Sequence, residues 1–240
     1  MPHSTHRFAL RSGLLPLLAS LPLSLVAACE WNEVEQGRLG RLELVPSDCG
    51  QSYCDLDDGV AVGGDLAITV RGKDGASARG LTLVSSAPWI VDVIDLEDDG
   101  FEPRFRVLGV GAGLAELSAL DANGYEVDYL PVEVATVADL EVSVVGDGAN
   151  ELVTVGYDSA FEIKAGALTT LDVIGTSRGR DLTGKYEYFA FLDATLAAAL
   201  EPDSDLARGY LRMRVPRPGD HDLTFIAPGG ATERIHLSVR

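Results

Sequence analysis

Hydrophobic and polar residues alternate along most of the chain beyond residue 60. The alternation is clear in 66–70 (LAITV), 105–107 (FRV) and 132–134 (VEV), and it returns near the C terminus in 223–226 (LTFI) and 235–239 (IHLSV). A period of two buries one face of a β-strand and leaves the other face in water. Short turns rich in Asp, Asn, Pro and Gly separate the runs at regular spacing. The pattern predicts an all-β protein of sandwich or barrel type.

Two turn sequences and one Ala-rich stretch add detail to this pattern. Asn123-Gly124 and Gly229-Gly230 suit two-residue hairpins, because such hairpins need positive φ at both turn positions. Residues 193–209 contain a stretch rich in Ala and Leu that has helical propensity. We expect the chain to leave the strand pattern there, either as one or two helical turns or as an edge strand.

Two blocks of sequence recur in the same order, which indicates an internal duplication. VAVGGDLAITV (60–70) matches VTVGYDSAFEI (153–163) at an offset of 93 residues, since 153 − 60 = 93. GAGLAELSALDANG (111–124) matches RPGDHDLTFIAPGG (217–230) at an offset of 106 residues, since 217 − 111 = 106. The matches predict two consecutive domains, residues 38–135 and residues 137–240.

Each of these units resembles a bacterial immunoglobulin-like (Big-type) repeat. The resemblance rests on SSAPWIVDVI (85–94) and FRVLGVGAGLAELSAL (105–120), where a Pro turn precedes one strand and a Gly-x-Gly turn precedes the next. It implies two tandem immunoglobulin-like β-sandwich domains, and it says almost nothing about a ligand. In such a sandwich we expect Trp89 to lie in a strand and to fill the core.

The first 28 residues have the pattern of an export signal. Arg7 and Arg11 precede an uncharged apolar run at 12–28, which is shorter than a membrane-spanning helix requires. The run ends in Val26-Ala27-Ala28-Cys29, which resembles the lipobox of bacterial lipoproteins. The resemblance implies cleavage before Cys29, lipid on its thiol and a linker at 29–37. The alternative is an ordinary signal peptide that is cleaved after an Ala.

The residue after Cys29 bears on the choice of membrane. An Asp at that position would resemble an inner-membrane retention signal, and Glu30 is not that signal. We therefore expect a lipid-anchored protein of the bacterial cell envelope, at the outer membrane rather than the inner one.

The charge balance of the chain excludes one class of partner. The sequence has 37 Asp and Glu residues against 19 Lys and Arg residues, for a net charge of −18. Nucleic-acid binding depends on Lys and Arg that neutralise phosphates, so nucleic acid is not expected as a partner. An acidic surface is also repelled by anionic lipids, so the lipid on Cys29 must supply the membrane affinity.

Two further cysteines, Cys49 and Cys54, lie in the sequence SDCGQSYCD. An exported protein folds in an oxidising compartment, and the Gly- and Ser-containing loop between them allows the two sulfurs to meet. The spacing is not that of a Cys-x-x-Cys redox motif, and a zinc site would need about four ligands. We expect a structural disulfide of modest stabilising effect.

One motif suggests catalysis, and its context argues against it. Gly175-Thr176-Ser177-Arg178-Gly179 matches the Gly-x-Ser-x-Gly elbow of esterases, with His221 and His236 downstream. That elbow requires a helix after the Ser, whereas a polar, Gly-containing stretch follows Ser177. We expect Ser177 to lie in a surface loop and both histidines to face solvent on strands. No cofactor is expected.

Two acidic turns offer oxygen ligands for calcium. Residues 95–100 (DLEDDG) and 55–59 (DLDDG) partly match the start of a calcium-binding loop, but Arg106 stands where the first of them needs a bidentate Glu. The other interpretation is that both are solvated hairpin turns, in which Asp and Gly serve turn geometry.

The most aromatic stretch is Tyr186-Glu187-Tyr188-Phe189-Ala190-Phe191. In a strand, Tyr186 and Tyr188 share one face, and Phe189 and Phe191 share the other. We expect the phenylalanines to face the core and the two tyrosines to form an exposed patch that contacts a glycan or a protein. The alternative is a central strand that residues 193–209 help to cover on both faces.

These observations predict a lipid-anchored, non-catalytic binding or scaffold protein of the cell envelope. Its expected partners are the membrane, through Cys29, and an envelope protein or glycan. The alternatives are a purely structural spacer or assembly subunit and, less favoured, a serine hydrolase that uses Ser177.

Overall fold

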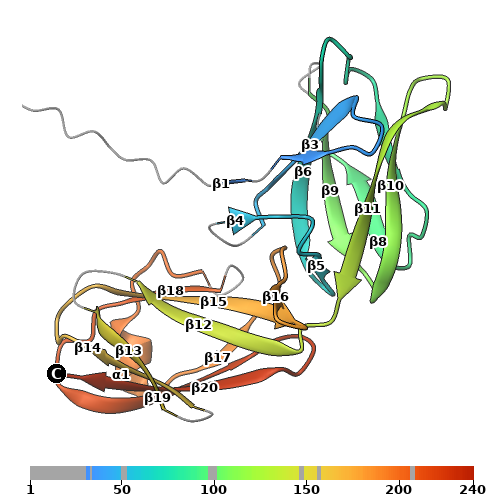
Figure 1. Cartoon of the computed structure of the whole chain (residues 1–240). Coiled ribbons are helices and arrows are strands. Elements are labelled where there is room, and N and C mark those ends of the chain that lie inside the picture. Colours follow the sequence, from blue (N-terminus) through green and yellow to red (C-terminus); the bar gives the residue numbers. More distant parts are fainter. Residues whose placement is uncertain are drawn as a thin grey trace, which may run out of the picture.

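The computed structural model describes residues 31–32, 34–49, 53–96, 102–145, 149–155, 158–205 and 209–240. The export signal and Cys29 lie outside these ranges. The described chain forms two β-sandwiches in succession, and the C terminus lies at the end of the second sandwich that is remote from the first (Figure 1). Within the described ranges, no helical segment has both the length and the hydrophobicity needed to cross a membrane.

The first sandwich pairs a five-stranded sheet with a four-stranded sheet. The five-stranded sheet has the order β2 (Glu35–Gln36), β3 (Leu42–Ser47), β6 (Asp65–Gly72), β9 (Arg104–Gly109) and β8 (Val91–Asp95). The four-stranded sheet has the order β5 (Val60–Ala61), β11 (Glu126–Ala135), β10 (Gly113–Leu120) and β7 (Thr82–Ser85). A separate short sheet joins β1 (Trp31–Asn32) to β4 (Tyr53–Cys54). Strands β1 and β2 thus lie within the segment expected to be a linker.

The second sandwich repeats this two-layer plan. One sheet contains β12 (Asp139–Val145), β15 (Thr169–Ser177) and β16 (Arg180–Asp181), with β18 (Tyr210–Met213) also paired to β15. The other has the order β13 (Ala149–Val155), β14 (Asp158–Ile163), β20 (Thr232–Val239), β19 (Gly219–Ile226) and β17 (Phe189–Phe191). In each sandwich a strand early in the chain joins the last strand in parallel, β5 with β11 and β14 with β20. This is an immunoglobulin-like arrangement, and the predicted all-β fold is confirmed.

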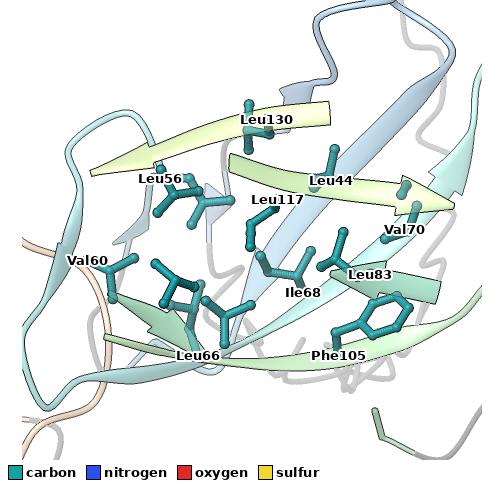
Figure 2. Close-up of a cluster of buried hydrophobic side chains, with 14 of the residues drawn as sticks. Leu44, Leu56, Val60, Leu66, Ile68, Val70, Leu83, Phe105, Leu117 and Leu130 are labelled. Atoms are coloured by element: carbon teal, nitrogen blue, oxygen red, sulfur yellow. The ribbon is translucent and has the colours of Figure 1, made fainter. Parts of the chain in front are cut away.

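Each sandwich has its own hydrophobic core. In the first, Leu44 and Ile68 of one sheet face Leu117 and Leu130 of the other, as Figure 2 shows. The second core is a separate cluster that includes Leu171 on one sheet and residues of β19 and β20 on the other. Each fully buried aliphatic side chain contributes roughly 1.5–3 kcal/mol, so the alternating strands account for most of the cohesion.

A buried carboxylate holds the start of β3 in the first sandwich. Asp128 on β11 is 0% exposed and accepts hydrogen bonds from the backbone N–H groups of Leu39 (2.7 Å), Arg41 (2.8 Å) and Leu42 (2.9 Å). Burial raises the pKa of the Asp128 carboxyl, but the amides of Leu39, Leu42 and Arg41 outweigh it and lower that pKa overall. Gly37 lies so close that a Cβ atom there would overlap the Asp128 carboxylate.

The two sequence matches have different outcomes. Strands β10 and β19 begin at Gly113 and Gly219, and their partners β11 and β20 begin at Glu126 and Thr232, so the offset of 106 relates equivalent strands. The offset of 93 is wrong as a structural alignment. It pairs β5 with the end of β13, whereas the strand that joins the last strand in parallel is β14. Strand β13, which pairs with β14, is an addition in the second sandwich.

Trp89 does not fill the core, so that prediction is wrong. Its side chain is 71% exposed. The carbonyl of Ala87 accepts hydrogen bonds from the N–H groups of Ile90 (2.8 Å) and Val91 (3.0 Å), which makes a tight turn between β7 and β8. The buried side chains at this place are those of Ala87 and Val91, and the turn directs Trp89 outward.

The predicted excursion at 193–209 is confirmed, and it contains a helix, α1 (Ala194–Ala199). The Asp193 carboxylate caps it by accepting from the N–H groups of Thr195 (2.8 Å) and Leu196 (2.9 Å). Leu196 is fully buried in the second core, and Ala199 and Leu200 pack against it, so these apolar side chains and the cap hold the short helix.

Backbone pairing joins the two sandwiches. The segment after β16 exchanges hydrogen bonds with the first sandwich: Ala61 N–H to Thr183 carbonyl (3.0 Å) and Lys185 N–H to Asp65 carbonyl (2.7 Å). Figure 1 shows β5 and β16 next to each other at this junction. Because backbone bonds fix both position and direction, the junction restricts how the two sandwiches move relative to each other.

Candidate binding surface

Tyr186 and Tyr188 are buried, so the predicted exposed tyrosine patch is wrong. Their side chains are 3% and 5% exposed. The Tyr188 hydroxyl donates to the Tyr186 hydroxyl (2.7 Å), which accepts from the N–H of Gly175 on β15 (2.6 Å). Both phenols are therefore hydrogen-bonded inside the protein, which removes the usual cost of burying them.

The absence of a side chain at Gly175 makes this burial possible. A Cβ atom at Gly175 would overlap the Tyr186 hydroxyl. Burial raises the pKa of Tyr186 to about 12 and also raises the pKa of Tyr188. Both tyrosines therefore stay neutral at physiological pH and act as structural hydrogen-bonding groups.

The exposed aromatic side chains of this stretch are Phe189 and Phe191, which are 58% and 63% exposed. Both lie on β17, the last strand of its sheet, while Ala190 between them packs on the second core. The sequence therefore identified which residues share a face and reversed which face is buried. The aromatic surface predicted for the tyrosines exists, but phenylalanines form it.

A row of paired charges lies beside these phenylalanines on the outward side of the same sheet. Asp222 on β19 accepts from Arg234 (3.0 Å) and pairs with Nδ1 of His236 (3.1 Å), both on β20. Hydrogen bonds from His236 and Arg234 lower the pKa of the Asp222 carboxyl. Nearer the C terminus, Asp220 accepts in the same way from Ser238 (2.7 Å). Sequence reasoning missed this row, whose signal was the alternation of Asp and polar residues along β19 and β20.

The two histidines have different surroundings. His236 faces outward with 45% of its side chain exposed, so its predicted solvent-facing position is confirmed. The side chain of His221 is only 10% exposed, and its Nδ1 lies 2.6 Å from a carboxylate oxygen of Asp193, the cap of α1. The prediction of a solvent-facing His221 is therefore wrong. Its role in the structure is to hold the capping carboxylate in place.

Ser177 is the last residue of β15, directly before the hairpin turn to β16, so its predicted place within a surface loop is wrong; a second strand follows it, not the helix of an esterase elbow. Ser177 pairs with Arg180, and the two turn residues, Arg178 (φ 56°) and Gly179 (φ 75°), both have positive φ. This is a two-residue hairpin with the backbone that such turns prefer, so the glycine of the motif serves the turn. At the other predicted hairpins only Gly124 and Gly230 have positive φ, so those turns are longer than expected.

The disulfide predicted between Cys49 and Cys54 is present, with Cα atoms 5.9 Å apart. Both cysteines are fully buried in the first core, so the disulfide is part of that core and not only a link within a surface loop. Asp48, next to Cys49, pairs with Lys185 of the second sandwich, so the disulfide lies beside a residue of the junction.

A cleft of about 450 Å³ lies at the junction, between Asp65 and Arg106 of the first sandwich and Lys185 and Pro228 of the second. Three of its charged groups take part in ion pairs, because Arg106 pairs with Asp65 and Lys185 pairs with Asp48. On the other side of the junction, Arg180 pairs with Glu133 at 2.6 Å. The Lys185–Asp48 and Arg180–Glu133 pairs cross the junction, whereas Arg106–Asp65 lies within the first sandwich.

The acidic turns do not assemble a metal site in the described structure. Among the described residues, no group of three or more His, Cys, Asp or Glu side chains is placed to hold a metal ion. At the first turn the Asp55 carboxylate accepts from the N–H of Asp57 (2.8 Å), which is a turn-forming bond. Of the second turn, Asp95 ends β8 and residues 97–100 lie outside the described ranges.

The sequence matches no family model and no curated protein. Several solved structures are similar to the chain at low TM-scores. Domains 5–6 of the S-layer protein SbsC are 18% identical, with 87% of this chain and 98% of that chain covered and a TM-score of 0.32. The Yersinia pseudotuberculosis adhesin InvE is 14% identical, with 85% and 61% covered and a TM-score of 0.31.

A third similar structure is the Bacteroides ovatus mixed-linkage glucan utilization locus protein SGBP-B, solved with a mixed-linkage heptasaccharide. It is 11% identical, with 83% of this chain and 53% of that chain covered and a TM-score of 0.35. The chain thus spans little more than half of this protein and of the adhesin. The two-sandwich fold described above rests on the strand pairings of the chain itself.

Proposed function

We propose that this chain is an exported lipoprotein that is tethered to the bacterial cell envelope through Cys29 and presents two joined β-sandwiches as a non-catalytic binding or scaffold module. The observation that carries the proposal is Val26-Ala27-Ala28-Cys29 at the end of an uncharged run. Such a cysteine carries two or more acyl chains, which hold a protein on a membrane far more firmly than one chain does.

Three features of the described residues support this role. The Cys49–Cys54 disulfide fits an oxidising compartment outside the cytoplasm. Strand β1 begins at Trp31, so only one residue separates it from Cys29 and the first sandwich would stand close to the membrane. The paired backbones at the junction suit a protein that presents surfaces in a fixed arrangement. We assign the membrane as the outer one, since Glu30 is not the Asp of inner-membrane retention.

The absence of catalysis is part of the proposal. Ser177, the nucleophile candidate, is fixed in a two-residue hairpin that offers none of the helix that an esterase elbow needs. We therefore expect no esterase activity and no change in any activity on Ser177→Ala. Hydrolysis of p-nitrophenyl esters that disappears in Ser177→Ala would contradict this part.

The tether is tested by growing a bacterium that expresses the full chain with radiolabelled palmitate and separating its membranes. We expect the wild-type chain to carry label and to stay in the membrane fraction in high salt. Cys29→Ser should lose both properties, and the matched control with Cys49→Ser and Cys54→Ser should keep both. An unlabelled wild-type chain in the soluble fraction would overturn the proposal.

A further inference from the structure

The outward side of the β17–β19–β20 sheet joins an aromatic strip to a row of hydrogen-bonding groups. Phe189 and Phe191 form the strip, with Ile226 of β19 directly opposite Phe189. Residues two apart on a strand are roughly 6.6 Å apart, so the two rings present neighbouring apolar surfaces on one side of the sheet. Thr224, opposite Phe191, marks the edge of the strip.

The hydrogen-bonding row begins one step further along β19. Asp222 lies two residues from Thr224 on the same face, and it holds Arg234 and His236 of β20 in defined positions. These side chains have planar polar groups that hydrogen bonds already orient, so they lose little freedom when they bind hydroxyl groups of a ligand. Aromatic surface next to oriented planar polar groups is the combination that recognises a sugar, which has apolar C–H faces and polar edges.

The local charge argues for an uncharged ligand. The chain as a whole carries −18, but on this face Asp220 and Asp222 are matched by Arg240 and Arg234. A locally neutral surface attracts neither anions nor cations over a distance. A polyhydroxylated, uncharged ligand fits it better than an acidic or a basic one.

The size of the apolar strip argues for a small occupant. The exposed parts of Phe189 and Phe191, 58% and 63% of their surfaces, amount to roughly 250 Å² if each ring side chain offers about 200 Å². A stable protein partner usually covers about 800 Å² on each side, of which roughly 450 Å² is apolar. The strip matches a few sugar rings rather than a protein interface.

We propose that this face, formed by Phe189, Phe191, Ile226, Asp222, Arg234 and His236, binds an uncharged oligosaccharide segment of a polysaccharide. The two phenylalanines stack on the sugar rings, and the Asp222 row binds their hydroxyl groups. The inference rests on the proposed function in that it names the ligand class of the binding module. It does not depend on the lipid, because all of these residues belong to the second sandwich.

The test is electrophoresis of the purified full chain, in a detergent without sugar groups, through native gels that contain a polysaccharide. The uncharged polymers are mixed-linkage β-glucan, xylan, galactomannan and dextran, and alginate is the anionic comparison. We expect at least one uncharged polymer, but not alginate, to slow the wild-type chain. The double variant Phe189→Thr/Phe191→Thr should bind at least about tenfold more weakly, a loss equivalent to ~1.4 kcal/mol.

The matched control is Tyr125→Ala, which removes a 72% exposed aromatic side chain from the first sandwich and should bind like the wild type. Thr keeps the strand propensity of β17, and Asp222→Asn tests the polar row without touching that strand. If the double variant does not fold, each single Phe→Thr variant and Asp222→Asn carry the same expectation.

Three results would overturn the inference. The first is a wild-type chain that none of the uncharged polymers slows. The second is full binding by the phenylalanine and Asp222 variants, and the third is an envelope protein that co-purifies with the wild type and not with Phe189→Thr/Phe191→Thr. If no uncharged polysaccharide binds but palmitate labels the chain, the sugar site is rejected and the lipid tether is not. If the chain binds a polysaccharide but carries no palmitate, the tether is rejected and the sugar site is not.

Discussion

The two sandwiches have similar strand arrangements, but the acceptors of their buried N–H groups differ in charge. In the first, the charged carboxylate of Asp128 accepts from the amides of the segment before β3. In the second, the neutral hydroxyl of Tyr186 accepts from the amide of Gly175. Both solutions need a nearby glycine, Gly37 in one case and Gly175 in the other, because a Cβ atom would overlap the accepting group.

This difference gives the sandwiches opposite responses to pH. The pKa of Asp128 is lowered in the fold, so its contribution is present above its unfolded pKa of about 4 and is lost as the pH falls through the folded value. The pKa of Tyr186 is raised to about 12, so its contribution is present below pH ~10 and is lost between about 10 and 12. Acid should therefore remove the contribution of Asp128 from the first sandwich, and alkali that of Tyr186 from the second, while the exposed paired carboxylates Asp220 and Asp222 add a smaller acid sensitivity to the second.

The largest effect is expected for Asp128→Asn. The amide side chain has only one acceptor oxygen and brings N–H donors towards the amides of Leu39, Arg41 and Leu42. We expect the first sandwich to lose roughly 4 kcal/mol of unfolding free energy, because buried amides lose a charged acceptor. Hydrogen exchange at 39–42 should accelerate at pH 7, and the acid sensitivity of the first sandwich should decrease, with Asp121 and Glu133 retaining theirs. Unchanged exchange at 39–42 would contradict this view of Asp128.

Tyr186→Phe is the corresponding change in the second sandwich. It leaves the Gly175 amide and the Tyr188 hydroxyl without their partner, for an expected loss of roughly 2–3 kcal/mol. Hydrogen exchange at Gly175 should rise, and the loss of stability between pH ~10 and 12 should shrink. Tyr125→Phe, at an exposed turn, serves as the control and should change neither. If Tyr186→Phe loses as much stability between pH ~10 and 12 as the wild type does, Tyr186 is not the cause of that loss.

The disulfide sharpens the comparison, because only the first sandwich contains one in the described chain. Replacing Cys49 and Cys54 by Ser should cost about 2 kcal/mol, the amount expected for so short a closed loop. Thermal unfolding should show a lower transition for the first sandwich, and reductant should have the same effect on the wild type. If only the unfolding transition of the second sandwich were lowered, the disulfide would not be stabilising the first sandwich.

The smallest effect is expected at the junction. Arg180→Gln removes the ion pair with Glu133, which is partly exposed on both sides, so the separate stabilities should hardly change. We expect the unfolding transitions of the two sandwiches to separate slightly and the effect to vanish in about 1 M salt, where screening is nearly complete. An effect that persists in such salt would show that Arg180 acts through packing.

The sequence was a good guide to where the strands lie. It was a poorer guide to which face of a strand is buried. Period-two alternation identified β10, β11, β19 and β20, because most of the residues on one side of each strand are apolar and buried. In residues 186–191 aromatic residues occur at both alternating sets of positions, so alternation could not decide which set is buried. The decision came from Gly175, a residue on another strand that lies eleven positions before Tyr186 and leaves room for its hydroxyl.

The errors at Trp89 and at the first repeat have similar causes. A large aromatic residue after a Pro was assigned to the core, but the tight turn from Ala87 to Val91 decides its direction. The repeat at 60–70 and 153–163 matched residue types that occur in many strands, and only the parallel pairing with β11 and β20 distinguishes β5 from β13. Information of that kind lies in contacts between distant segments, which a local pattern does not contain.

The central claim is that Cys29 becomes the lipidated first residue of a membrane-held protein. The most direct measurement is the intact mass of the full chain purified from membranes, followed by sequencing of its N-terminal peptide. We predict that residues 1–28 are absent and that Cys29 carries a diacylglycerol group and a further acyl chain. A chain that retains residues 1–28, or that begins at another residue with an unmodified N terminus, would contradict the account.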